Sequence, residues 1–219
     1  MKLFRQNFTM IPINIFFRRN CKMYENYKKA RNTSWDVLLN CGISKLPISL
    51  GVIADLYDIK VIAYSDTNIT QVLKNEVVEG DGFIAYSGGK KEIYINDKIN
   101  SRNRRRFTLA HELGHGVLNH DIGTVHYRNS EIDNQTDMQE FEANVFARNV
   151  LMPATVLSAL DIHTTEEIMK ICEVSRKSAE IRAARMELLY KRNMFNSHPL
   201  ERKVREQFNQ FIKTYKKQT

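Results

Sequence analysis

Three residues in the segment AHELGHGVLNH could bind a metal ion and activate water. His111 and His115 are four positions apart, and Glu112 follows the first of them, which gives the pattern H-E-x-x-H. On an α-helix, residues i and i+4 lie on the same face, so both imidazoles can reach one tetrahedral ion. Glu112 is then held beside that ion without being a ligand, and it can accept a proton from water. The pattern predicts a zinc site with Glu112 as general base.

A catalytic zinc needs a third protein ligand, and the helical segment MQEFEANVFARNVLM offers two carboxylates. Glu140 belongs to a polar stripe on the helical wheel. Glu142 falls on the apolar side, between Val145 and Phe146. A carboxylate on an apolar face is costly unless a cation meets it. We therefore predict Glu142 as the third ligand, with Glu140 as the alternative.

The segment between these two motifs is predicted to be a long loop. Residues 120–137 contain glycine, asparagine and acidic residues, and a long loop beside a motif is often functional. His126 and Tyr127 in this loop could donate a hydrogen bond to the oxyanion that develops when a carbonyl is hydrolysed. Histidine and tyrosine in loops more often have no catalytic role, so both residues are secondary candidates.

Helices are predicted before and after the motif. Apolar spacing indicates a first helix over residues 24–41, which Gly42 would cap at its C-terminus. A short helix should follow Pro47, and the motif lies in a helix from Asn100 to about Asn119. The remaining helices are expected at about residues 138–151, ending before Pro153, and at 154–160, 165–173, 176–193 and 199–216.

A small sheet is predicted between the first helices and the motif. Residues 59–64 are β-rich, and the runs GFIAYS and EIYIN flank Gly88-Gly89, which is typical of a β-hairpin. We expect EIYIN, residues 92–96, at the sheet edge, where an extended substrate could add as a further strand. This order of helices, sheet and helices predicts an α+β fold, followed by a C-terminal helical region.

The composition is typical of a soluble globular protein. Hydrophobic residues make up 42% of the chain and charged residues 26%, and no segment has the pattern of a membrane span. Cys21, Cys41 and Cys172 are far apart and form no C-x-x-C pair, which argues against a disulfide framework or a structural zinc site. We therefore expect a cytoplasmic protein in a reducing compartment that does not act at a membrane.

Sequence patterning divides the chain into three parts. Residues 1–22 precede the first regular pattern and are expected to be an N-terminal extension. Residues 23–160 hold the sheet and both motifs and form the predicted metallopeptidase domain. Residues 161–219 form the helical C-terminal region. The last part carries the charge, because residues 176–219 contain twelve Lys or Arg against four Glu, which equals the net charge of +8 of the whole chain.

Part of the C-terminal region is similar to a helix-turn-helix. The segment TTEEIMKICEVSRKSAEIRAARMELL is expected to form two helices with a turn at Val174-Ser175, but Glu173 stands before this turn, where a helix-turn-helix often has glycine. Basic residues on a surface helix usually form a solvated face. We favour a helical pair that packs on the catalytic domain over direct DNA binding.

Both motifs, in their order and separation, resemble the ImmA/IrrE family of zincin-like metallopeptidases. The similar segments are RNRRRFTLAHELGHGVLNH and EFEANVFARNVLMP, and the resemblance covers about residues 45–155. It implies one zinc ion per chain with His111, His115 and Glu142 as ligands, and Glu112 as the catalytic glutamate. It also implies a protein substrate, because family members often act beside helix-turn-helix repressors of mobile elements or stress responses, and some promote cleavage of the repressor.

The resulting prediction is a zinc-dependent metalloendopeptidase that cleaves a protein, with a helix-turn-helix transcriptional repressor as the expected substrate. The alternative is a non-hydrolytic DNA-binding or scaffolding regulator on the same fold, which the basic C-terminus would suit. Glu112 favours the enzyme, since a protein that only binds has no need of a general base.

Overall fold

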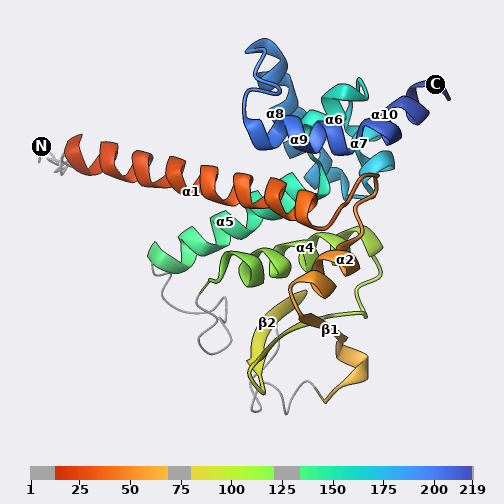
Figure 1. The fold of residues 1–219 in the computed structure, drawn as a ribbon. Coiled ribbons are helices and arrows are strands. Elements are labelled where there is room, and N and C mark those ends of the chain that lie inside the picture. The colour runs from red at the N-terminus through yellow and green to blue at the C-terminus, as the bar shows by residue number, and fades with distance from the viewer. Residues whose placement is uncertain (1–12, 69–79, 121–133, 219) are drawn as a thin grey trace, which may run out of the picture.

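The computed structural model describes residues 13–68, 80–120 and 134–218, which form helices around a small sheet (Figure 1). The strands are β1 (Ile59–Ala63), β2 (Gly82–Ser87) and β3 (Lys90–Ile95). The helices before and within the motif region are α1 (Ile13–Asn40), α2 (Leu50–Leu56), the 3-10 turn η1 (Tyr64–Asp66), α4 (Arg102–Leu118) and α5 (Asn134–Leu151). Those that follow are α6 (Ala154–Ala159), α7 (Thr165–Cys172), α8 (Arg176–Lys191), α9 (Pro199–Gln207) and α10 (Asn209–Lys216).

The α+β class is confirmed, and most of the predicted elements are found within a few residues of their predicted bounds. Two helices differ. Among the described residues, α1 starts at Ile13, eleven residues before the predicted helix, because it continues past residue 22 towards the N-terminus. The predicted helix 199–216 is split at Phe208, whose fully buried side chain lies at the junction of α9 and α10.

The sheet has the strand order β1-β3-β2 among the described residues. β2 and β3 form the predicted antiparallel hairpin, with Gly88 and Gly89 at φ +57° and +81° in its turn, a backbone conformation that glycine adopts without strain. β1 pairs in parallel with β3, with Val61 opposite Ile93. The predicted edge position of EIYIN is therefore wrong, because β1 occupies the side of β3 that the local pattern left open.

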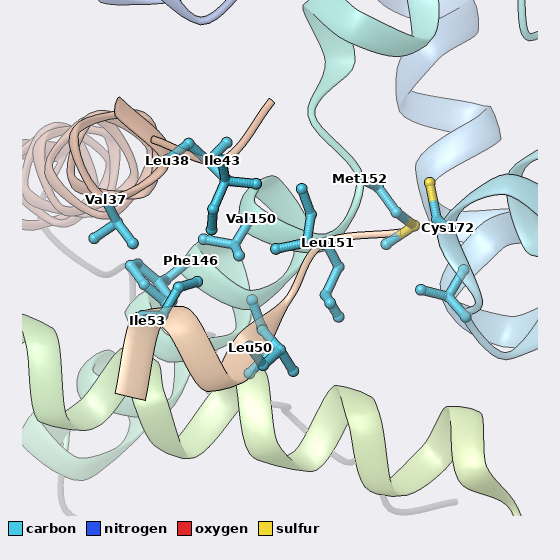
Figure 2. Close-up of a cluster of buried hydrophobic side chains, with 14 of the residues drawn as sticks. Val37, Leu38, Ile43, Leu50, Ile53, Phe146, Val150, Leu151, Met152 and Cys172 are labelled. Carbon is cyan, nitrogen blue, oxygen red and sulfur yellow. The ribbon is translucent and has the colours of Figure 1, made fainter. Parts of the chain in front are cut away.

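Helix α5 lies between α1 and α4 and is the centre of the core (Figure 1). Figure 2 shows Val37 and Leu38 of α1 and Ile53 of α2 gathered around Phe146 and Val150 of α5. All five side chains are fully buried, and each contributes roughly 1.5–3 kcal/mol by leaving water. Since α4 packs on the other side of α5, this core fixes the two helices that carry the predicted metal ligands relative to each other.

The helical pair α7–α8 packs on α4 and α5, which is the arrangement favoured from the sequence. The Nδ2 of Asn103, in the first turn of α4, donates to the carbonyl of Val174 at 3.1 Å. Arg102 forms an ion pair with Glu173 at 3.1 Å, and Glu173 takes the left-handed conformation, φ +52°, that ends α7. Met186 of α8 is buried in the shared core. None of the helices in the described ranges is long and apolar enough to cross a membrane.

Candidate metal centre

Helix α4 presents the H-E-x-x-H residues towards α5. Ser101 starts the helix by accepting a hydrogen bond from the backbone N–H of Arg104 at 3.2 Å. Three turns later His111, Glu112 and His115 are all buried. The Nε2 atoms of the two histidines lie 3.0 Å apart. Two nitrogens bound to one tetrahedral zinc would be about 3.3 Å apart, so the pair is already close to a chelating geometry.

The third group at this point is Glu140 of α5. Its Oε2 lies 3.2 Å from Nε2 of His111, and its Oε1 lies 3.3 Å from Nε2 of His115. The ligand atoms of these three residues lie within 4.8 Å of one another, so together they could hold a metal ion. Two imidazole nitrogens and one carboxylate are a donor set that catalytic zinc sites use, and the residues present therefore fit the metal that the sequence predicted.

The electrostatics of Glu140 suit a ligand. Burial by itself would raise the pKa of the Glu140 carboxyl, but the hydrogen bonds and the charge interaction with His111 and His115 outweigh it and hold that pKa well below its usual range. Glu140 is thus ionised at neutral pH. Its side chain is 37% exposed, and a catalytic metal needs such an open side so that water and substrate can reach it.

Glu142, the predicted third ligand, is not part of this group of three, and its carboxylate contacts other side chains. Its Oε2 accepts from Nε2 of His120 at 3.0 Å and from Nζ of Lys29 at 3.4 Å. Its side chain is only 6% exposed. The helical wheel correctly predicted that Glu142 is buried, but a histidine and a lysine, both outside the motif, provide the positive charge and donors that it needs.

His120 connects Glu142 to the metal-binding group. Helix α4 ends at Asn119, whose left-handed conformation, φ +53°, turns the chain back so that the N–H of His120 donates to the carbonyl of His115 at 3.1 Å. The Nδ1 atoms of His115 and His120 then lie 3.0 Å apart. Burial lowers the pKa of His120, so it is neutral near pH 7 and can donate from one ring nitrogen while it accepts at the other.

Tyr64 is a further polar group, within the electrostatic influence of Glu112, that the sequence reasoning missed. Burial raises the pKa of its hydroxyl, and the negative charge of Glu112 raises it further. The hydroxyl is buried and has no hydrogen-bond partner among the described residues. Tyr64 follows β1 directly, so only the fold brings it near α4. His126 and Tyr127, the predicted oxyanion donors, lie outside the described residues.

The comparison with protein families decides the assignment. A family model described as the IrrE N-terminal-like domain, of a peptidase family, matches residues 56–184, which is more than half of the chain. The chain belongs to the ImmA/IrrE family. The match to this ImmA/IrrE domain includes α4, α5 and the whole metal-binding group, and it continues through α7 into α8. Among curated proteins, none matches the chain significantly.

Membership of the ImmA/IrrE family makes this a peptidase-family domain, and the geometry is in keeping with it. The matched range contains the H-E-x-x-H helix and the group of two histidines and a glutamate that could hold a metal ion. The packing of α7 and α8 against α4 and α5 agrees with a family match that extends past residue 160.

Proposed function

We propose that the protein is a zinc-dependent endopeptidase in which His111, His115 and Glu140 hold one zinc ion per chain. The observation that carries this proposal is the convergence of two Nε2 atoms and one ionised carboxylate on one point, with Glu112 on the same helix. When bound, zinc would make a water molecule more acidic and would polarise the carbonyl of the scissile peptide.

Glu112 is the residue to which we assign proton transfer. It follows His111 directly, so it is held next to the metal-binding group while the third ligand comes from another helix. From there its carboxylate would take the proton of the attacking water and pass it to the leaving amine.

The hydrogen bonds that run from His115 through His120 to Glu142 would fix the orientation of His115. With Nε2 of His115 facing the metal, its proton sits on Nδ1 and is donated to Nδ1 of His120. His120 in turn donates from Nε2 to Glu142. Such a chain of outer partners sets the tautomer of a histidine ligand and increases its basicity. Glu142 is therefore a positioning residue in this proposal and not a ligand.

For the substrate we propose a helix-turn-helix transcriptional repressor in the same cytoplasm, which the resemblance to ImmA/IrrE proteins implies. The experiment is co-expression of the chain with the repressor encoded beside it. Wild type should yield a shortened repressor, whereas Glu112→Gln should lower the cleavage rate by about 10²–10⁴-fold at unchanged zinc content. Glu206→Gln, at an exposed position on α9, is the matched control and should cleave as wild type does. Equal cleavage by Glu112→Gln would favour the non-hydrolytic regulator.

A further inference from the structure

A cavity of about 690 Å³ lies on the face of α5 away from α4, between α1, α5 and α8. Its apolar lining comes from all three helices and includes Met23, Phe141, Val145, Ile181 and Leu188. Three of these side chains are exposed: Met23 at 45%, Ile181 at 44% and Leu188 at 44%. Large apolar side chains gathered at this exposure around one cavity are typical of a binding surface.

Four arginines line the same cavity: Arg148, Arg182, Arg185 and Arg192. None of the lining residues that the structure describes is Asp or Glu, and within the described ranges none of the four forms an ion pair. Arg185 lies against the ring of Tyr27, at 5.8 Å from its centroid, and its side chain is exposed, so solvent or a partner can reach it. The cavity is therefore both apolar and strongly cationic.

Arg182 is the most buried of these four arginines. Its side chain is buried, with Nη2 donating to the carbonyl of Arg148 at 2.7 Å and to Oδ1 of Asn149 at 3.1 Å. Its Nε has no hydrogen-bond partner among the described residues. Burial lowers the pKa of Arg182 to about 10, so it still carries its charge at neutral pH. A buried cation without a counter-ion is costly, and a carboxylate in the cavity would relieve that cost.

We propose that this cavity is a docking site for an acidic amphipathic segment of a partner protein. Apolar side chains of that segment would enter between α1, α5 and α8, and its carboxylates would pair with the arginines at the rim, as in a helix bound in a groove. Charge complementarity selects this occupant. Residues 1–12 of the chain contain Lys2 and Arg5 and no acidic residue, so they match the arginines poorly. The proposal does not depend on hydrolysis.

The docking site and the metal centre share α5. Phe141, which lines the cavity, stands between Glu140 and Glu142 in the sequence. Tyr27 of α1 also lines the cavity, two residues before the Lys29 that pairs with Glu142. A partner held here would thus lie next to the metal centre, on the opposite side of one helix.

The test is titration of the full-length protein with a labelled amphipathic peptide of about 16 residues, with Leu and Phe on one face and Glu on the other. Two further peptides carry Gln or Lys in place of every Glu. Fluorescence anisotropy should show saturable binding of the Glu peptide that weakens as salt rises, at least about tenfold weaker binding of the Gln peptide, and no binding of the Lys peptide.

Substitutions in the protein locate the binding. Arg185→Glu and Leu188→Ser change exposed side chains and should each weaken binding of the Glu peptide at least about tenfold, with unchanged thermal melting. Arg205→Glu makes the same charge change at an exposed position of α9 outside the cavity and should leave binding unchanged. The proposal is overturned if the Glu peptide does not saturate by about 1 mM, if the Lys peptide binds equally well, or if Arg205→Glu weakens binding as much as Arg185→Glu does.

Two further outcomes would assign the cavity to another occupant and likewise overturn the proposal. A dimer in sedimentation experiments that dissociates in Arg185→Glu would show that a second copy of the chain fills the cavity. An affinity for the Glu peptide that rises about tenfold or more in the double variant Phe4→Ser, Phe8→Ser would show that the chain's own N-terminal residues compete for it.

Discussion

Two clusters of histidine and glutamate meet at His115, and they differ in what their geometry allows. In the first, the open cluster, His111, His115 and Glu140 direct their ligand atoms to one point, and Glu140 is 37% exposed. In the second, the closed cluster, His115, His120 and Glu142 are linked in a row, and Glu142 is 6% exposed. The same residue types can thus form a metal-binding group or a chain of hydrogen bonds. Convergence and access to solvent distinguish the two, whereas burial alone does not.

The largest effect that separates the clusters should come from comparing His115, which belongs to both, with His111, which belongs only to the open one. His111→Ala and His115→Ala should each weaken zinc binding by about a thousandfold or more, because each removes a ligand. His115→Ala should lower the free energy of unfolding of the metal-free protein by about 1–3 kcal/mol more than His111→Ala does, since only His115→Ala leaves Nδ1 of His120 buried without its partner.

Urea denaturation in the presence of a chelator measures the second effect, and competition with a zinc indicator measures the first. Equal stability of the two metal-free variants would mean that the closed cluster contributes nothing to the fold.

A smaller effect is expected from the middle of the closed cluster. His120→Phe should keep the shape of the ring but remove both hydrogen bonds, and it should weaken zinc binding by about 10–100-fold, as changes to outer partners of metal ligands do. Lys29→Met is the matched control. Its ion pair with Glu142 is 3.4 Å long and the lysine side chain is 56% exposed, so zinc affinity should change by less than about threefold. Unchanged zinc affinity in His120→Phe would show that His120 does not orient His115.

How much of this could be predicted from the sequence differs between the two clusters. His111, Glu112 and His115 are separated by fixed helical spacing, so their common face followed from the residues themselves. Whether Glu140 or Glu142 faces the histidines depends on how α5 is rotated against α4, and the helical wheel shows only which side is buried. Neither His120 nor Tyr64 could be found from spacing, because a left-handed turn at Asn119 and the packing of the sheet on α4 place them. The parallel pairing of β1 with β3 could not be predicted either, because it joins two segments that lie about 30 residues apart in the sequence.

The smallest predicted effect concerns the contact that holds the two clusters' helices together. A Cβ on Gly114 would meet the ring of Phe146 at 3.0 Å and the backbone of Ala143 in α5 at 3.2 and 3.3 Å. A Cβ on Gly116 would meet no backbone atom but the ends of flexible side chains, Ile59 and Ile84 at 2.8 and 2.9 Å and Lys91 at 3.8 Å. Gly114→Ala should therefore push α5, and Glu140 with it, away from the histidines. Zinc affinity should fall by about three- to tenfold in Gly114→Ala and stay unchanged in Gly116→Ala. The same affinity in both variants would show that the α4–α5 distance does not limit the site.

The central claim is that the half-exposed Glu140 is the third ligand and the buried Glu142 is not. Its most direct test is the zinc dissociation constant of Glu140→Gln and Glu142→Gln, each measured by competition with the same indicator. Glu140→Gln should weaken zinc binding by about a thousandfold or more, because it removes the charged ligand. Glu142→Gln should weaken it by no more than about 10–100-fold, because its effect passes through His120. Loss of zinc from Glu142→Gln together with full retention by Glu140→Gln would contradict the account.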